Sequence, residues 1–249
     1  MNPIPKRLNK EPLIEAIWQA QFEPKKGLPV GDLLPGILYS ALKVEYTYLQ
    51  LHRLPTADIP APVAQFDPNL RFAAKVRLDA ADAPFLWQVG DRVANLNCRK
   101  PYVGWERFKA AILDFIQTVE DSGLVQQSLR HSLRYIDLLT RDTPPDLSSL
   151  QLSMRMGAHA IQKLPLQARV ELPDDEYMHV IQIATPAQVQ LPEGICEGSV
   201  IDLETLMAKP PASWGEARDQ LEELHARSKR LFFEHLLTAA AIEALEPEY

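Results

Sequence analysis

The sequence predicts an α+β fold in which antiparallel sheets carry long helices packed on one face. Three observations support this prediction. Several stretches alternate apolar and polar residues, neighbouring stretches are joined by hairpin turns, and two long amphipathic segments each follow a group of strands. Residues 143–145, Thr-Pro-Pro, cannot continue a helix or a central strand, so they separate residues 1–145 from residues 146–249. We expect two similar strand-plus-helix halves, with one continuous domain as the alternative.

The first half contains the clearest strand and a well-marked helix. In residues 13–22, Trp18 and Phe22 share one face with small apolar residues, while glutamine and glutamate occupy the other. Residues 104–121 carry apolar side chains at steps of three and four, with Gly123 placed for a C-terminal cap. Further strands are expected at residues 44–54, 70–78, 83–97, with a turn at 89–92, and 125–139. A short helix over residues 32–43 and a proline-rich loop over residues 55–68, mobile or laid over a partner, complete this half.

The second half is predicted to begin with antiparallel strands and to end in the longest helix. The strands are expected at residues 152–161, 166–172, 178–184 and 199–206, with a turn at 173–176. Ser213 and Glu216 have the spacing of a capping box and open the helix. Its apolar stripe runs from Leu221 to Leu237.

Composition excludes several classes of protein. The chain has 249 residues, of which 46% are hydrophobic, so it is not intrinsically disordered. No apolar run reaches the ~18 residues of a membrane span, and no apolar stretch follows Lys6 and Arg7 as in a secretory signal. Cys98 and Cys196 are too far apart for a zinc motif or a disulfide framework. We expect a cytoplasmic protein without membrane association.

Charge is divided unevenly along the chain. Residues 1–170 have a balance of +4 and residues 171–249 a balance of −11, which gives the net charge of −7. Such asymmetry indicates either an interaction surface or solvated acidic helix faces. A net-acidic chain is a poor candidate for binding duplex DNA. The sequence contains no glycine-rich phosphate loop, nucleophile elbow, HExxH or CxxC motif, so we predict no cofactor and no metal.

The most concentrated basic group lies in residues 130–134. Arg130 and Arg134 share one face of the predicted strand, with His131 on the other, and Arg155 and His159 repeat this polarity in the next strand. Two such strands would present a positive stripe to phosphate or carboxylate. His131 or His159 would then be the acid–base group for RNA cleavage. The alternative is an ordinary polar sheet face that pairs with the acidic C-terminal helix.

Three further groups have both a functional and a structural interpretation. Glu222 and His225 lie at i and i+3 and share a helix face, as metal-binding pairs do, but such a pair is far more often a solvated or hydrogen-bonded helix surface. Asp137 and Asp202 each lie within an apolar strand, where a buried carboxylate needs a partner. We interpret both as structural acids that accept hydrogen bonds from the backbone or arginine.

Five motifs in this order resemble a sporadically distributed prokaryotic family of uncharacterised α+β proteins of about this length. They are EPLIEAIWQAQFEP, PYVGWERFKAAI, SLRYIDLL, GSVIDLETL and ELHARSKRLFFEHLLT. The residues that match the family pattern are Pro12, Glu15, Tyr102, Trp105, Arg134, Tyr135, Asp137, Asp202, His225, Phe232 and Thr238. The resemblance implies no activity. It implies an accessory role in mobile-element or antiviral-defence loci.

These observations favour a non-enzymatic binding or regulatory protein that acts through a protein partner. Its predicted surface is the Arg130 and Arg134 strand or the acidic final helix with Glu222. The alternative is an RNA-binding or RNA-processing protein of paired ferredoxin-like type, in which Arg155 and His159 would take part.

Overall fold

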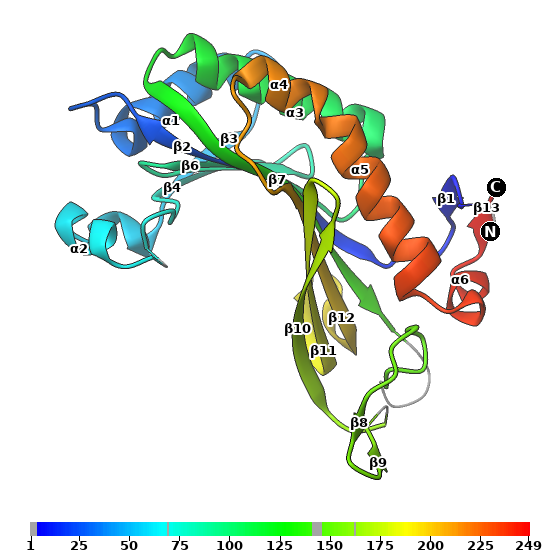
Figure 1. Ribbon diagram of the computed structural model, residues 1–249. Helices are drawn as coiled ribbons and strands as arrows, with labels where there is room; N and C mark the ends of the chain where they lie inside the picture. Colours follow the sequence, from blue (N-terminus) through cyan, green and yellow to red (C-terminus); the bar gives the residue numbers. More distant parts are fainter. Residues whose placement is uncertain (1–3, 69, 141–145, 162) are drawn as a thin grey trace. The chain divides into compact units, whose positions relative to one another are not determined.

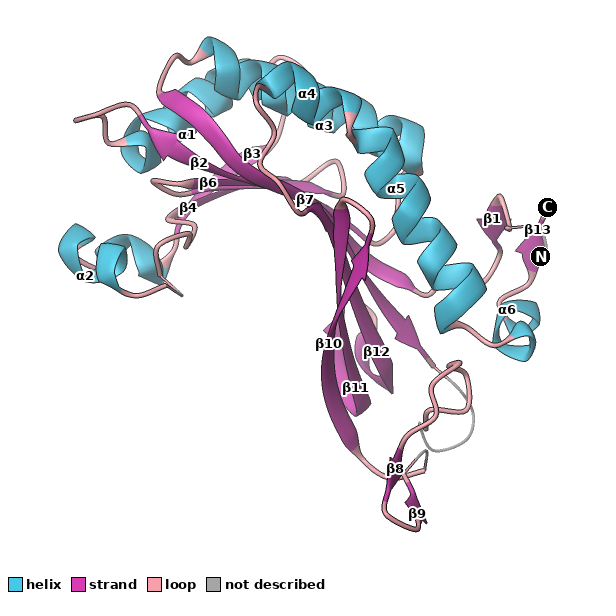
Figure 2. Ribbon diagram, viewed as in Figure 1, coloured by secondary structure: helices cyan, strands magenta, loops and turns pink. Residues whose placement is uncertain are grey.

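A computed structural model describes residues 4–68, 70–140, 146–161 and 163–249, and Figures 1 and 2 show their helices and strands. The strands are β1 (Arg7–Leu8), β2 (Leu13–Pro24), β3 (Leu49–Arg53), β4 (Val76–Ala80), β5 (Phe85–Val89), β6 (Val93–Arg99), β7 (Val125–Leu139), β8 (Arg155–Met156), β9 (His159–Ala160), β10 (Leu166–Asp174), β11 (Tyr177–Leu191), β12 (Gly194–Met207) and β13 (Pro247–Glu248). The helices are α1 (Val30–Leu42), α2 (Ala61–Phe66), α3 (Trp105–Asp121), α4 (Trp214–Asp219), α5 (Leu221–Arg230) and α6 (Ala239–Ala244), with a 3₁₀ turn at Pro55–Asp58 and a π-helical turn at Leu231–Leu236. The α+β class with antiparallel sheets is confirmed.

The chain divides into two compact units, each made from separated stretches of sequence. The N-terminal unit contains Glu15–Leu133 and Leu206–Leu221. The C-terminal unit contains Met1–Ile14, Arg134–Thr205 and Glu222–Tyr249. This division differs from consecutive halves that meet at residue 145, because β2, β7 and β12 each contribute residues to both units.

The N-terminal unit contains an antiparallel sheet whose apolar side supplies its core. Its strands follow the order β7-β2-β6-β5-β4-β3. Leu96 of β6 lies opposite Trp18 of β2 on one side and Trp87 of β5 on the other. All three side chains are buried, as the period-two pattern of β2 predicts. The hairpin between β5 and β6 is confirmed, and Gly90 N–H donates to the Val93 carbonyl at 2.9 Å.

Helix α3 packs its predicted apolar face into this core. It begins after Gly104, at φ 85°, and Gly123, at φ 64°, lies just beyond its C-terminal end. The buried residues of this face are Phe108, Ile112, Phe115, Ile116 and Val119. Phe115 meets Trp18 edge-to-face, with ring centroids 5.8 Å apart. Helix α3 contacts β6, and α1 contacts β4, β5 and α3.

Two predicted strands are shorter than expected, and the proline-rich loop contains helix. The prediction over 44–54 corresponds to β3 alone, and that over 70–78 overlaps β4 only at its end. Residues 55–68 form the 3₁₀ turn and α2, since a proline precedes or opens each turn and pre-sets its φ. Residues 55–68 have no apolar periodicity, so periodicity alone does not predict α2.

The C-terminal unit contains strands in the order β10-β11-β12-β7. The predicted pair of β10 and β11 is antiparallel, from Leu166 opposite Thr185 to Asp174 opposite Tyr177. Asp175, at φ 53°, takes the left-handed conformation in the two-residue turn between them. The strand predicted over 152–161 is wrong in length, because only the short hairpin of β8 and β9 forms there.

The C-terminal helix is interrupted rather than continuous. Ser213 Oγ accepts from the Glu216 N–H at 3.2 Å, so the predicted cap is confirmed, but α4 ends before α5 begins. The π-helical turn follows α5, with the Leu237 N–H donating to the Phe232 carbonyl at 3.1 Å. The core of this unit includes Ile181, Ile183, Ile201, Leu203, Leu231, Phe232 and Leu237. Within the residues that the structure describes, no helix is long and apolar enough to cross a bilayer.

Candidate functional site

Arg134, one of the four residues of the predicted basic stripe, is paired with a carboxylate in the C-terminal unit. Its guanidinium donates from Nε to Asp202 Oδ1 at 2.6 Å and from Nη2 to Asp202 Oδ2. Gln182 Nε2 also donates to Asp202 Oδ2, at 3.3 Å. Because a bidentate carboxylate cancels most of the charge of the guanidinium, Arg134 is a weak anchor for an external phosphate. The expected arginine partner of Asp202 is therefore present.

The second strand of the predicted stripe does not lie beside the first. β8 hydrogen-bonds only to β9, whereas the neighbours of β7 are β2 and β12. Arg155 and His159 are therefore exposed on a separate hairpin, where Arg155 Nη2 donates to the Ala158 carbonyl at 3.3 Å. The prediction of a stripe on two adjacent strands was wrong, because β8 pairs with β9 and the neighbours of β7 are other strands. Arg130 is half-buried in the portion of β7 that belongs to the N-terminal unit.

His131 is 1% exposed and packs within the N-terminal unit. Its Nε2 lies 2.7 Å from Gln220 Oε1. Burial lowers the pKa of His131 below its ordinary value, so the ring is neutral near pH 7. In this conformation the imidazole has no access to an RNA phosphate.

Glu222 and His225 lie on α5 as the sequence predicts, but they use their side chains differently. Glu222 is exposed, whereas His225 Nδ1 lies 2.9 Å from the hydroxyl of Tyr135. Burial, together with the positive charge of Lys229, lowers the pKa of His225 to about 4, against a smaller opposing effect of Glu222. Among the described residues, no group of three or more His, Cys, Asp or Glu side chains is placed to hold a metal ion.

A hydrogen-bonded series of polar side chains in the C-terminal unit was not predicted. Asp174 Oδ2 lies 3.3 Å from His179 Nε2, His179 Nδ1 lies 2.8 Å from Thr205 Oγ1, and Ser228 Oγ donates to Thr205 Oγ1 at 2.7 Å. The order acid, imidazole, hydroxyl is that of hydrolytic triads. The hydroxyl groups of Thr205 and Ser228 are almost fully buried, so no substrate reaches them. The hydrogen-bonded series therefore has a structural role. His179 has the same strand parity as Ile181 and Ile183, which is the one signal that marks it as buried.

Asp137 is a buried acid of the C-terminal unit whose pKa is strongly raised. Its side chain is buried, and burial, with the nearby negative charges of Glu11 and Asp202, raises its pKa to about 8. Its carboxyl group is therefore mostly protonated at pH 7, which removes the free-energy penalty of a buried charge. The sequence suggests an arginine or backbone partner for this carboxyl group. In the structure, protonation rather than such a partner allows the group to be buried.

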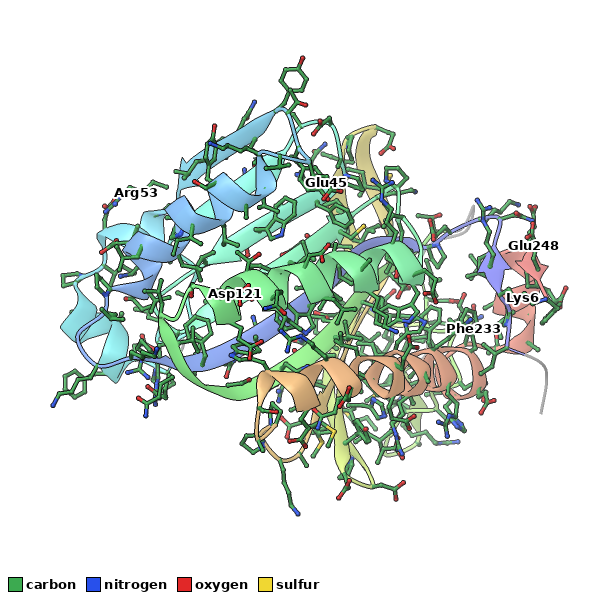
Figure 3. All side chains as sticks on the ribbon, turned by 90° about the horizontal axis from the view of Figure 1, so that it is seen from above. Lys6, Glu45, Arg53, Asp121, Phe233 and Glu248 are labelled. Carbon is green, nitrogen blue, oxygen red and sulfur yellow. The ribbon has the colours of Figure 1, made fainter. Side chains whose placement is uncertain are left out.

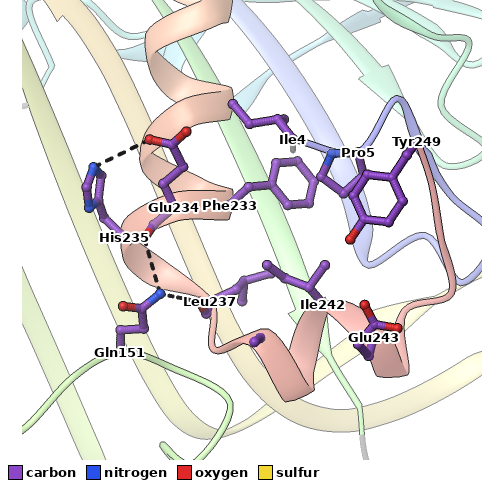
Figure 4. A pocket seen from close by; sticks show the side chains of 11 residues that line it. Ile4, Pro5, Gln151, Phe233, Glu234, His235, Leu237, Ile242, Glu243 and Tyr249 are labelled. Carbon is purple, nitrogen blue, oxygen red and sulfur yellow. Dashed lines mark hydrogen bonds and ion pairs between the residues drawn. The ribbon is translucent and has the colours of Figure 1, made fainter. Parts of the chain in front are cut away.

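A cavity of about 230 Å³ in the C-terminal unit lies beside the π-helical turn. Phe233, Ile242 and Tyr249 converge on it, and Glu234 and His235 lie at its edge, with Glu234 Oε2 3.9 Å from His235 Nε2 (Figure 4). Gln151 Nε2 donates to the carbonyls of Glu234 and Leu237, at 3.2 and 2.6 Å, and so satisfies the end of the turn. The volume is below the ~300–1,000 Å³ of typical small-molecule pockets.

The N-terminal unit exposes large apolar side chains in one stretch of sequence. Nine of the fifteen large apolar side chains that are exposed in the described residues lie within residues 28–66, which we call the apolar region. They are Leu28, Leu33, Ile37, Tyr39, Val44, Tyr48, Leu51, Val63 and Phe66. Phe66, at the end of α2, is 89% exposed, and Val63 lies one turn before it. Val63 and Phe66 therefore lie together on one face of α2, and an exposed apolar pair of this kind is typical of an interaction surface.

No protein-family model matches the chain, and no curated protein matches it. The assignment of function therefore rests on the geometry of the chain itself.

Proposed function

We propose that this protein is a non-enzymatic binding protein whose apolar region docks onto a different protein. The observation that carries the proposal is the exposure of Val63 and Phe66 on α2, a short helix with prolines at its N-terminal end. A large aromatic side chain in water gains about 2 kcal/mol or more on burial, so a partner groove that accepts Phe66 would be favoured.

The charge content of the apolar region supports the proposal. Only five of its 39 residues are charged, against 24% of the whole chain. The centres of protein interfaces are depleted of charged residues and enriched in aromatic ones. Tyr39, Tyr48 and Phe66 supply that aromatic content.

The partner is a different protein rather than a second copy of this chain. A projecting phenylalanine needs an apolar hole in the opposite surface. Two cavities lined by the described residues carry charged side chains at their walls: Glu234 and Glu243 in the cavity beside the π-helical turn, and Arg71 and Asp91 in a second one beside the start of α1. Neither is the uncharged apolar hole that a projecting phenylalanine fills.

Three of the candidate polar groups bond within the chain, which also supports a binding role. His131 and His225 are hydrogen-bonded to Gln220 and Tyr135, and Arg134 is paired with Asp202. Cys98 and Cys196 are both in the reduced state, in keeping with action in a reducing cytoplasm. A place in a mobile-element or defence locus belongs to the same proposal and is supported only by the resemblance of the five motifs.

The test is native mass spectrometry of the protein purified from its own host at low salt. We expect a stoichiometric second protein with the wild type and its loss with Val63→Ser/Phe66→Ser. Glu222→Lys, an exposed change on α5, serves as the control and as the test of the acidic helix as a surface. Loss of the partner only in Glu222→Lys would move the interface to that helix. A salt-sensitive nucleic acid in place of a protein would favour the RNA alternative.

A further inference from the structure

A second cavity, of about 420 Å³, lies within the N-terminal unit and has a volume typical of ligand sites. Five basic side chains from three separate segments line it, namely Lys25, Lys26, Arg71, Lys75 and Arg92. We propose that this cavity binds a small organic anion, an apolar body that carries a phosphate or carboxylate group.

The positive charges of this cavity are only partly compensated. Glu23 accepts from Arg71 at 3.1 Å and also from Arg92, so one carboxylate serves two guanidinium groups. Asp91 pairs with Lys75 at 2.6 Å. Lys25 and Lys26 line the same cavity, and within the described part of the chain neither is paired with a carboxylate. The positive charges of these two lysines therefore remain available to attract an anion into the cavity.

The walls are held together by specific close contacts rather than by loose loops. Asp91 Oδ1 accepts from the Gly31 N–H at 3.2 Å, and a Cβ atom at position 31 would lie 2.7 Å from that oxygen. A Cβ atom at Gly90 would lie 2.2 Å from the Ala73 carbonyl oxygen. Both glycines let the start of α1, the β5–β6 turn and the chain before β4 approach closely. The Gly31 amide is already satisfied, so the proposed site rests on the side-chain cations and not on the helix terminus.

Apolar residues complete the lining and define the body of the ligand. Leu28, Ile59 and Leu70 contribute to the cavity together with several prolines and alanines. An inorganic ion would leave these groups in contact with water, whereas a ring or short alkyl group would bury them. The combination predicts that an aryl phosphate or aryl carboxylate binds more tightly than the free ion.

Asp32 is exposed in the first turn of α1, and its substitution should change ligand affinity in the opposite direction to that of the lysines. It lines the cavity, and within the described residues it has no cationic partner. Its negative charge opposes an anionic ligand, so its removal should strengthen binding. A purely structural role for these charges would not produce opposite effects on affinity.

The experiment is a calorimetric titration of the full chain with phenyl phosphate, benzoate and inorganic phosphate, with amide shifts of Gly27 and Gly31 followed by NMR. We expect phenyl phosphate to bind about ten-fold more tightly than inorganic phosphate, and the comparison with benzoate identifies the preferred anionic group. Lys25→Ala/Lys26→Ala should weaken binding about ten-fold, and Asp32→Asn should tighten it a few-fold. Lys43→Ala/Lys100→Ala removes two exposed lysines that do not line the cavity and should change nothing. Equal affinities in both double-lysine variants, or shifts away from the cavity, would overturn the proposal.

Discussion

Helices α1 and α5 use their side chains in opposite ways. α5 is rich in charge, yet His225 and Arg227 bond within the C-terminal unit, and Leu224 and Ser228 are buried. α1 carries a single charged residue, Asp32, yet it leaves Leu33 and Ile37 in contact with water. The amount of charge on a helix therefore does not identify the surface that is open to a partner. The contacts that each side chain already makes do so.

The largest effect is expected at Arg227, where α5 meets β10 and β11. Arg227 Nη1 donates to Asp174 Oδ2 at 2.7 Å, its Nε donates to Glu223 Oε1 at 2.6 Å, and its guanidinium lies 4.3 Å from the centroid of the Tyr177 ring. Arg227→Ala should lower the free energy of unfolding by about 2–3 kcal/mol, because its side chain is only 15% exposed. Urea unfolding measures this change.

The matched control is Arg53 in the N-terminal unit, an outward-pointing residue in Figure 3. Its side chain is 63% exposed and pairs with Asp58 at 2.9 Å. Arg53→Ala should change stability by about 0.5 kcal/mol or less. Equal losses in the two variants would contradict the internal role of α5.

The second effect is a pH dependence that arises from Asp137. Its pKa is raised to about 8 in the folded chain, above the ordinary value of 3.8, so the folded state binds an extra proton between these values. Stability should therefore fall as pH rises toward 8, by on the order of 2 kcal/mol from pH 6.5 to pH 8. Asp137→Asn should flatten this part of the curve. A wild-type curve that is already flat over this interval would show that Asp137 is ionised in the folded chain.

The third effect compares two glycines of the same helix. Gly31→Ala places a Cβ atom 2.7 Å from Asp91 Oδ1 and should destabilise the N-terminal unit by about 1–2 kcal/mol. Gly36→Ala meets no atom within 4 Å and should stabilise α1 by about 0.5–1 kcal/mol. Thermal unfolding of both variants gives the two signs. Destabilisation of similar size in both would show that the cavity wall is not specially tight.

The smallest effect on stability is expected in the apolar region. Val63→Ser/Phe66→Ser removes two exposed side chains and should change the free energy of unfolding by about 0.5 kcal/mol or less, while it removes the partner. A loss above about 2 kcal/mol, measured by urea unfolding, would mean that these residues pack within the chain. The expected loss of stability is thus several times smaller than that of Arg227→Ala.

Local pattern predicted the elements but not the partners of their side chains. The strand at β2, the helix at α3, the β5–β6 hairpin and the β10–β11 pair follow from periodicity and turn chemistry, which act over a few residues. The pairing of Arg134 with Asp202 joins residues 68 positions apart, and no local signal specifies it. The carbonyl groups at the end of the π-helical turn accept hydrogen bonds from Gln151, which lies far away in the sequence. Residues 231–236 alone therefore do not predict the turn.

The candidate residues were identified largely through their charge, and this explains why several proved to be internal. The local sequence around a histidine or arginine in a strand does not show whether its side chain faces solvent or a partner within the chain, such as Gln220 or Asp202. The proline-rich loop was the exception. The option that it covers a partner stays a prediction, now with Val63 and Phe66 as its contact residues.

The most direct test of the docking proposal is photo-cross-linking from position 66. A benzophenone amino acid at Phe66, introduced into the full chain in its host, should give one discrete cross-linked product with a different protein. The same probe at Tyr249, which is also exposed but lies outside the apolar region, should not give that product. The product should disappear when the probe at position 66 is combined with Val63→Ser, one turn away on the same helix. A product formed only between copies of this chain, or no product at position 66, would contradict the proposal.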